Sequence, residues 1–340
     1  MRTITFKNPP IISATCTVSG KMEGERLGNH FDKVLTDAKQ NKKCWEQAES
    51  ALQQQTVQLL LDKTNKKQED IDLIISGDLL NQCTGAHYGL RDFNIPFYGI
   101  FGACATMAES LSLAALITSS GYYNNIIAGT SSHFYSAERQ FRQPIEYGGQ
   151  RAPTAQWTAT GCGMALVTSA SQNKLEKSKT NNDSLIRITS ITPGRIIDKG
   201  ITDANNMGAA MAPAAIDTIV QHLNETGRDA EYYDMILTGD LGLLGRKIVT
   251  DDLKKQGIPT KTYDDCGCML FDFQKQDVHC GASGCGCSAL VICGYILDLM
   301  RQGKINRVLF VGTGALLSPT SVLQGESIPC IAHAIVIEKD

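Results

Sequence analysis

The sequence predicts an α/β fold made of two similar halves, each a β-sheet covered by helices on both faces. Short apolar segments alternate with helical patterns along the 340 residues, which is typical of βαβ units. The segment IDLIISGDL at residues 71–79 returns as YDMILTGDL at residues 233–241. A polar tract at residues 171–183 separates the two copies. We therefore expect a duplicated protein with an N-terminal half, residues 1–175, and a C-terminal half, residues 184–340.

The elements of the first half follow from the periodicity of their apolar residues. Trp45, Leu52 and Leu59 fall at helical spacing and predict a helix over residues 45–63. Residues 22–43 are polar, and we expect a loop there. Five short apolar segments are predicted as buried strands: residues 11–18, 72–76, 96–100, 125–129 and 163–168. Because helices connect most of these strands, we expect a mostly parallel sheet.

A second helix, over residues 104–119, begins with small side chains and has a counterpart in the second half. The segment that begins at Gly102 matches the segment that begins at Cys285 at a constant offset. This match pairs Cys104 with Cys287 and Gly129 with Gly312. Small residues at both starts would let these two helices approach closely at the centre of the molecule. Residues 280–297 are uncharged but rich in Gly, Ser, Ala and Cys, so they predict a glycine-rich turn and a buried helix rather than a membrane span.

Composition excludes several classes of protein. The chain has 32 Lys and Arg against 35 Asp and Glu, a net charge of −3, with 42% hydrophobic residues, which excludes disordered and fibrous proteins. Without a dense basic segment, nucleic acid is not an expected partner. The start MRTITFKNPP has no apolar run after its charged residues, so we expect no signal peptide and a cytoplasmic protein without a transmembrane segment.

The twelve cysteines are expected to be reduced thiols. A zinc site is the alternative for the five cysteines near the second central helix, but their spacing lacks the paired CxxC ligands of structural zinc. We expect neither a metal nor a cofactor. The five are Cys266, Cys268, Cys280, Cys285 and Cys287.

The motif GACAT at residues 102–106 places Cys104 at a helix start. The partial positive charge of a helix N-terminus lowers the pKa of a thiol and favours the thiolate, which attacks acyl thioesters. With the duplication, this motif resembles the thiolase and ketoacyl synthase superfamily over nearly the whole chain. The resemblance implies a five-layered αβαβα sandwich of two similar halves, with Cys104 at the nucleophile position.

The other catalytic positions depart from that superfamily. Its condensing enzymes carry a His after the first strands of the second half and a His or Asn in the glycine-rich turn before the last central helix. Here these places hold Asp240 and the pair Ala282 and Ser283. An ionised carboxylate donates no hydrogen bond to an enolate oxygen, and alanine has no donor. We therefore expect a degenerate site without catalytic residues.

A narrower resemblance rests on long strings of residues. They are GTSSH at 129–133, ERQFRQPIEYGGQRAPTAQWTATGCG at 138–163, TPGRIID at 192–198 and GDLGLLGR at 239–246. These strings are similar to the stage V sporulation protein AD family of spore-forming bacteria. The resemblance implies a protein that binds dipicolinic acid, or its calcium chelate, and serves dipicolinate movement in sporulation and germination. It also implies other stage V sporulation membrane proteins as partners, and a peripheral place on the cytoplasmic side of the inner spore membrane.

Dipicolinate is a planar dianion, which calls for cationic donors and a flat apolar wall. Arg139, Arg142 and Arg151 cluster after His133, with the aromatic residues Tyr147 and Trp157 in the same segment. The alternative is that these arginines pair with Glu138 and Glu146 across a dimer interface. The candidate ligand-binding residues are Cys104, His133, Arg142, Arg151, Asp78 and Asp240.

Each candidate also has a structural alternative. Cys104 could pack in the core, His133 could be a satisfied buried histidine, and Asp78 and Asp240 could cap the helices that follow their strands. The alternative function is an acyl-transferring or condensing enzyme that uses Cys104 with a partner such as His133. The resemblance further implies a homodimer, paired edge to edge through the strand at residues 125–129.

Overall fold

The computed structural model describes residues 1–141, 150–171 and 185–340. Its main sheet follows a path of ten strands whose two ends mirror each other. The first half contributes, from the centre outward, β2 (Ile11–Ser19), β8 (Gly161–Thr168), β6 (Asn125–Ser132), β4 (Leu73–Gly77) and β5 (Phe97–Gly99). The second half contributes, in the same order, β9 (Ile186–Thr192), β14 (Cys330–Lys339), β13 (Arg307–Ala315), β10 (Met235–Thr238) and β11 (Tyr263–Asp265). The two sets meet where Ile11 pairs with Arg187.

The expectation of a mostly parallel sheet is wrong at the centre. In each half the three outer strands are parallel to one another, whereas the inner strands run antiparallel. The reason is that the chain comes back from β6 to β8, and from β13 to β14, in the opposite direction, and antiparallel neighbours need no crossover over the face of the sheet. The sheet is therefore mixed.

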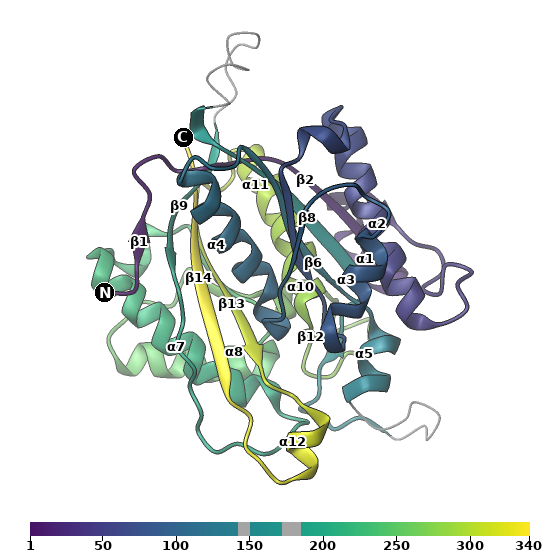
Figure 1. Ribbon diagram of the computed structural model, residues 1–340. Helices are drawn as coiled ribbons and strands as arrows, with labels where there is room; N and C mark the ends of the chain where they lie inside the picture. The colour runs from purple at the N-terminus through teal and green to yellow at the C-terminus, as the bar shows by residue number, and fades with distance from the viewer. Residues whose placement is uncertain (142–149, 172–184) are drawn as a thin grey trace.

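Helices and sheets form five layers, as the resemblance implied (Figure 1). α2 (Trp45–Thr64) and α3 (Thr84–Leu90) cover the outer face of the first half, and α7 (Met207–Thr226) and α8 (Gly242–Lys255) cover that of the second. The middle layer consists of α4 (Thr106–Ser119) and of α10 (Cys285–Leu290), which continues through a π-helix (Val291–Ile296) into α11 (Leu297–Arg301). Alternation along each strand sends Ile74 to the outer core and Ile75 to the central one.

Each central helix packs against strands of the opposite half. A Cβ added at Gly312 of β13 would lie 2.5 Å from the Cβ of Ala108 in α4. A Cβ at Gly163 of β8 would lie 2.5 Å from the carbonyl oxygen of Ala289 in α10. The absent side chains thus allow contact that any larger residue would prevent. The expected close approach of the central layer is present, and it interlocks the two halves.

Residues 22–43 are not the continuous loop that their polarity predicted. They contain most of α1 (Lys21–Leu27), a 3₁₀ turn (Gly28–His30) and β3 (Lys33–Val34), which pairs with β2. Burial of a few side chains outweighs the polar average: Leu27 and Phe31 join the central core, and Glu23 accepts a hydrogen bond from the amide of Thr160 at 2.8 Å.

The remaining elements are short. β1 (Ile4–Thr5) pairs with β9, and β7 (Trp157–Thr158) pairs with β12 (Ala282–Ser283) in a small separate sheet. The short helices are α5 (Phe134–Phe141), α9 (Cys266–Met269) and α12 (Pro319–Leu323), and the 3₁₀ turns are Gln68–Asp70, Asn81–Cys83, Ala103–Ala105 and Ala230–Tyr232. None of the helices in the described ranges is long and apolar enough to span a bilayer.

The strand predicted to form the dimer interface is not an edge strand. β6 extends to Ser132 and pairs with β4 on one side and β8 on the other. Its backbone groups are therefore already engaged, and it cannot pair with a second chain. The edge strands of the ten-strand path are β5 and β11.

Candidate functional site

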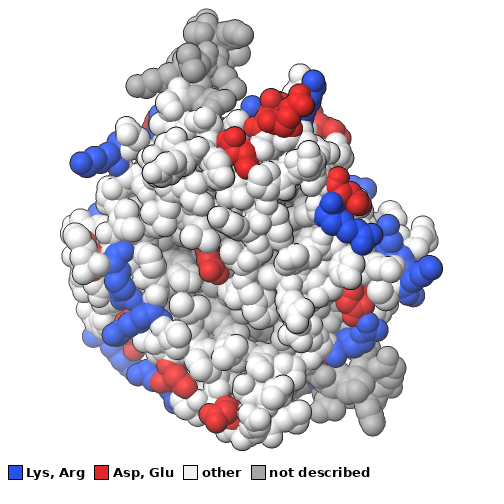
Figure 2. Space-filling view, viewed as in Figure 1, with Lys and Arg blue, Asp and Glu red and all other residues white. Residues whose placement is uncertain are grey.

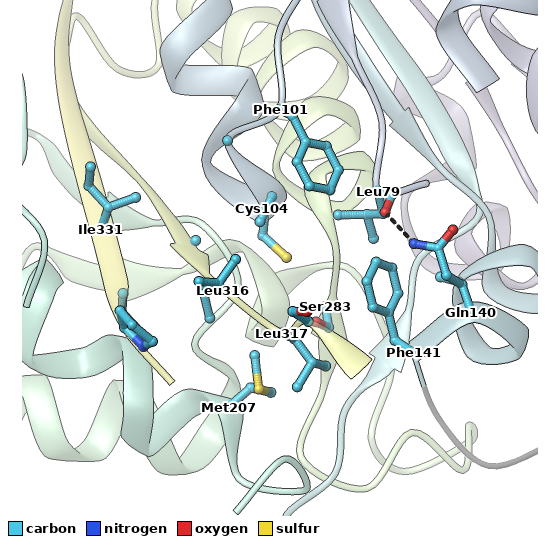
Figure 3. Close-up of a pocket in the computed structure, with 18 of the residues that line it drawn as sticks. Leu79, Phe101, Cys104, Gln140, Phe141, Met207, Ser283, Leu316, Leu317 and Ile331 are labelled. Carbon is cyan, nitrogen blue, oxygen red and sulfur yellow. Dashed lines mark hydrogen bonds between the residues drawn. The ribbon is translucent and has the colours of Figure 1, made fainter. Parts of the chain in front are cut away.

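A cavity of about 750 Å³ opens at the start of the first central helix. Its walls come from both halves: the 3₁₀ turn before α4, helix α5, and the segment that links β13 to α12. Figure 3 shows the Cys104 Sγ pointing into the space between Phe101, Phe141 and Leu316. Most of the lining is apolar, and the described lining residues include no Lys or Arg. Figure 2 shows the same character at the surface, where Lys and Arg lie toward the periphery of this face.

Cys104 and Asp240 are in contact beside this cavity. The Cys104 thiol hydrogen-bonds to the buried Asp240 carboxylate. Asp240 also accepts hydrogen bonds from the amide of Gly284 at 2.8 Å and from Thr313 Oγ1 at 2.8 Å. Ser283 Oγ, which lines the cavity, lies 3.3 Å from the same carboxylate. Asp240 therefore ties the thiol to the glycine-rich turn of the second half.

The expectation of a thiolate at Cys104 is contradicted by these surroundings. Burial raises the pKa of the Cys104 thiol well above its usual range, and the carboxylate of Asp240 raises it further. Burial also raises the pKa of Asp240 itself. The partial positive charge of the helix N-terminus, which lowers a thiol pKa, is outweighed here. The α-helix begins only at Thr106, and the carboxyl group of Asp240 faces the sulfur. Cys104 is thus a neutral thiol and a hydrogen-bond donor.

Asp78, the counterpart of Asp240, lies off the cavity. Its carboxylate accepts hydrogen bonds from the amides of Leu80 at 2.8 Å and Ala86 at 2.7 Å, near the start of α3. Burial raises its pKa to about 6. This is the capping arrangement named above as the alternative to ligand contact.

His133 does not line the cavity. It follows β6, is fully buried, and its Nε2 donates to the carbonyl of Ala38 at 2.9 Å. Its ring lies 5.6 Å from that of Trp45, and burial lowers its pKa. The structure therefore does not bring His133 to Cys104. The histidine among the described residues that line the cavity is His333, whose Nδ1 accepts a hydrogen bond from the amide of Gly194 at 3.1 Å and whose pKa is lowered by burial.

The predicted arginines do not contribute to the described cavity wall. Arg151 donates to the carbonyls of Gln156 at 3.2 Å and Asp277 at 3.1 Å, and its guanidinium lies 4.6 Å from the centre of the Trp157 ring. Its planar group thus braces the glycine-rich turn. Arg142, together with Glu146 and Tyr147, lies outside the described residues. Arg139 forms an ion pair with Glu46 on the surface.

Several residues of the site were not predicted. Phe101, Phe141 and Gln140 line the cavity, as do the carboxylates Glu109 and Glu138. Glu109 Oε2 is buried with no hydrogen-bond partner among the described residues, and burial raises the pKa of this acid. Only the position of Glu109 one turn after Thr106 in the sequence could have indicated that it faces the same space as Cys104.

Gln156 is a further residue that the sequence did not single out. It is buried, and its Nε2 donates to the carbonyls of Asp240 at 2.7 Å and Ala282 at 2.6 Å. It therefore joins the two positions at which the condensing enzymes carry their catalytic side chains. Gln156 thus holds the backbone at Asp240 and at Ala282 together.

Comparison with known proteins identifies the family. The profile of the family described as Stage V sporulation protein AD (SpoVAD) matches residues 1–338. Stage V sporulation protein AD of Bacillus subtilis (strain 168) is 45% identical over 340 residues, which cover 99% of this chain and 97% of that protein. The chain belongs to the stage V sporulation protein AD family.

Solved structures place this family member in a wider fold group. It is similar to 3-oxoacyl-[acyl-carrier-protein] synthase III from Aquifex aeolicus VF5, with a TM-score of 0.56 and 12% identity over 97% of this chain and 99% of that one. It is also similar to a variant of OleA from Xanthomonas campestris, with a TM-score of 0.57 and 13% identity over 99% and 98% of the two chains. The fold class predicted from the sequence is confirmed: the family has the thiolase-like fold.

Proposed function

We propose that this protein binds dipicolinic acid, free or as its calcium chelate, in the cavity beside Cys104 and does so without catalysis. The observation that carries the proposal is the Cys104–Asp240 contact at the cavity wall. The position that would supply a nucleophile holds a neutral thiol, and the His133 side chain is directed to the carbonyl of Ala38 instead of to Cys104. Such a site recognises a ligand and leaves it unchanged.

The cavity supplies the groups that a flat aromatic ligand requires. Phe101 and Phe141 offer ring faces, and Figure 3 shows them flanking the space in front of Cys104. Gln140 lies at the same wall, with its Nε2 donating to the carbonyl of Leu79 at 3.2 Å. A ligand carboxylate would take over donors that now serve the protein itself: the Gln140 amide, which donates to Leu79 and Asn81, and the Ser283 hydroxyl and Cys104 thiol, which donate to Asp240.

The charge of the dianion has to be balanced in this cavity. The described walls carry only the acids Glu109 and Glu138, which oppose a bare dianion. Arg142 directly follows Phe141 in the sequence and is one source of positive charge. A calcium ion chelated with the ligand is the other, since Ca²⁺ keeps coordination positions free for carboxylates.

Calorimetry with purified protein tests the proposal. Dipicolinate is titrated with and without calcium into the wild type, Phe101→Ala and Arg142→Gln, with Tyr122→Ala as the matched control because Tyr122 is 85% exposed and does not line the cavity. We expect Phe101→Ala to weaken binding about tenfold, the control to bind as wild type, and Arg142→Gln to weaken binding of the free dianion more than that of the chelate. Equal binding by Phe101→Ala and the wild type would contradict this site.

A parallel incubation with acyl-coenzyme A thioesters tests the enzymatic alternative. We expect no mass increase at Cys104. A covalent adduct with turnover would replace the proposed function with acyl transfer.

We also propose a homodimer, now through β5 instead of β6. β5 pairs only with β4, and residues 95–108 around it carry no charge. Tyr98, in the middle of this edge strand, is 61% exposed. Pairing of β5 with its copy would cover the strand and continue the sheet. Light scattering checks the mass: a value near 36.9 kDa at micromolar concentration would contradict the dimer.

The family resemblance also supports a peripheral place at the inner spore membrane, beside other stage V sporulation membrane proteins. We therefore propose this membrane-peripheral location together with the ligand. Fractionation of spores, followed by detection of the protein in membrane and soluble fractions, tests it.

A further inference from the structure

A second, shallower groove runs along the outer flank of the second half, far in sequence from the Cys104 cavity. It has a volume of about 520 Å³ and lies between α8 and the segment that leads into β11. One face of α8 forms its first wall, because residues three and four apart share a helix face: Leu243, Arg246, Lys247, Thr250 and Lys254. Thr260 and Tyr263 form the second wall.

The groove is positively charged in a chain that is acidic overall. Residues 243–264 hold five Lys or Arg and three Asp, whereas the whole chain has a net charge of −3. Two of the cations are paired: Arg246 with Asp264 at 2.7 Å and Lys247 with Asp251 at 2.6 Å. Lys254, Lys255 and Lys261 are exposed and form no ion pair with any described residue.

The backbone beside the groove does not accept an extended peptide. β11 is an edge strand, but its outward amides are already used within the chain. The amide of Tyr263 donates to the carbonyl of Thr260 at 3.2 Å, and the amide of Asp265 donates to Asp264 Oδ1 at 2.8 Å. An added strand would find no free donors there. Recognition at this flank therefore depends on side-chain charge.

The row of Lys and Arg side chains on the groove face of α8 is long enough to contact several anions at once. Arg246 and Lys254 are eight residues apart on one helix, or roughly 12 Å at the helical rise. A single phosphate would occupy only one end of this distance, whereas a membrane surface presents several. Leu243, which is 40% exposed at the start of this row, adds an apolar contact of the kind that interfacial helices use.

We infer that this flank of α8 docks on the anionic phospholipid headgroups of a membrane. The inference rests on the proposed membrane association but not on the cavity ligand. Each lysine near an anionic surface contributes a modest attraction, so several acting together give reversible binding that weakens with salt.

Vesicle flotation tests the inference without dipicolinate. We expect the wild type to float with vesicles of phosphatidylglycerol and phosphatidylcholine in equal parts, and not with phosphatidylcholine alone. The double variant Lys247→Glu/Lys254→Glu is expected to bind at least tenfold more weakly. The matched control Lys7→Glu/Lys304→Glu changes the net charge equally at exposed sites away from the groove and is expected to bind as wild type.

Three outcomes would overturn the inference: equal loss in both double variants, binding independent of lipid charge, or failure of the wild type to float. In a further arm, inorganic phosphate is added at 10 mM, a concentration that would fill a site with a Kd on the order of 1 mM. Release by phosphate but not by the same ionic strength of chloride would assign the groove to a small anion instead. Dipicolinate calorimetry on Lys247→Glu/Lys254→Glu separates the two proposals, because the cavity is intact in that variant.

Discussion

The two central helices begin with cysteines related by the internal duplication, yet their surroundings differ. Cys104 is half-buried and faces the large cavity, whereas Cys287 is fully buried with its Sγ 3.7 Å from the carbonyl of Gly239. Burial raises the pKa of both thiols well above the usual range. One copy of the motif thus faces an accessible space, whereas the other is enclosed in the core.

Asp78 and Asp240, which the duplication also pairs, differ in what their carboxylates contact. Asp78 holds backbone amides near α3, and Asp240 holds the glycine-rich turn and the Cys104 thiol. The difference shows that a residue of the second half controls the chemistry of a residue of the first. The cavity therefore depends on both halves, although only one contributes the thiol.

The largest expected effect separates these two aspartates. Asp240→Ala and Asp78→Ala should each lower the free energy of unfolding by about 3 kcal/mol, because each leaves several buried donors unpaired. Only Asp240→Ala should speed alkylation of Cys104 by iodoacetamide at pH 8, since it removes the carboxylate that raises the thiol pKa. Urea titration and mass spectrometry measure the two quantities, and equal alkylation rates in both variants would contradict the assigned role of Asp240.

A comparable effect concerns one buried acid in each half. Burial raises the pKa of Glu23 to about 7 and that of Asp265 to about 7. A raised folded-state pKa contributes stability that is full below the ordinary carboxyl pKa and lost as pH rises toward 7. Glu23→Gln and Asp265→Asn should each flatten the fall in unfolding free energy between pH 4.5 and 7 by up to about 3 kcal/mol. Urea unfolding across this range checks it, with Glu25→Gln as control.

A smaller effect compares the two glycines that seat the central helices. Gly163→Ala meets the carbonyl oxygen and the carbonyl carbon of Ala289, whereas the closest contact of Gly312→Ala is the Cβ of Ala108. Neither Ala289 nor Ala108 can move the clashing atoms without moving its backbone. Gly163→Ala would make three contacts of 3.0 Å or less and Gly312→Ala only one, so we expect about 3 kcal/mol of destabilisation for Gly163→Ala and about 1 for Gly312→Ala. Thermal unfolding measures both, and the reverse order would contradict the packing described.

The smallest effect returns to the two cysteines. Cys104→Ala should keep the fold and weaken dipicolinate binding less than tenfold, because a neutral thiol is a weak hydrogen-bond donor. Cys287→Ala should leave affinity unchanged and cost about 1 kcal/mol of stability from the lost packing. Calorimetry and urea unfolding distinguish them. A loss of affinity above a hundredfold in Cys104→Ala would show chemistry at the sulfur.

The sequence predicted the frame of the molecule better than its site. Matching segments around Asp78 and Asp240 predicted the mirrored sheet, because repeated local patterns fold alike. The antiparallel centre was missed, since strand direction depends on how β8 and β14 return and not on their composition. The raised pKa of Cys104 was missed because it is caused by burial and by the carboxylate of Asp240, which lies 136 positions away in the chain.

The solvent exposure of the site residues could not be predicted from the sequence either. His133 and Cys104 follow neighbouring elements in the sequence, but only the packed structure shows that one is enclosed beside Trp45 and the other opens on the cavity. The same limit applies to Gln156, whose role depends on two loops that are distant in sequence.

The seating of each central helix on the other half has a consequence for synthesis of the chain. While the ribosome is still making the second half, α4 lacks the β13 surface that covers it, and β8 lacks α10. The nascent first half would expose apolar surface until the last strands emerge, so we expect its folding to be completed only at the end of translation. A gene fragment encoding one half is therefore a poor source of a folded domain, and chaperone demand should peak just before release.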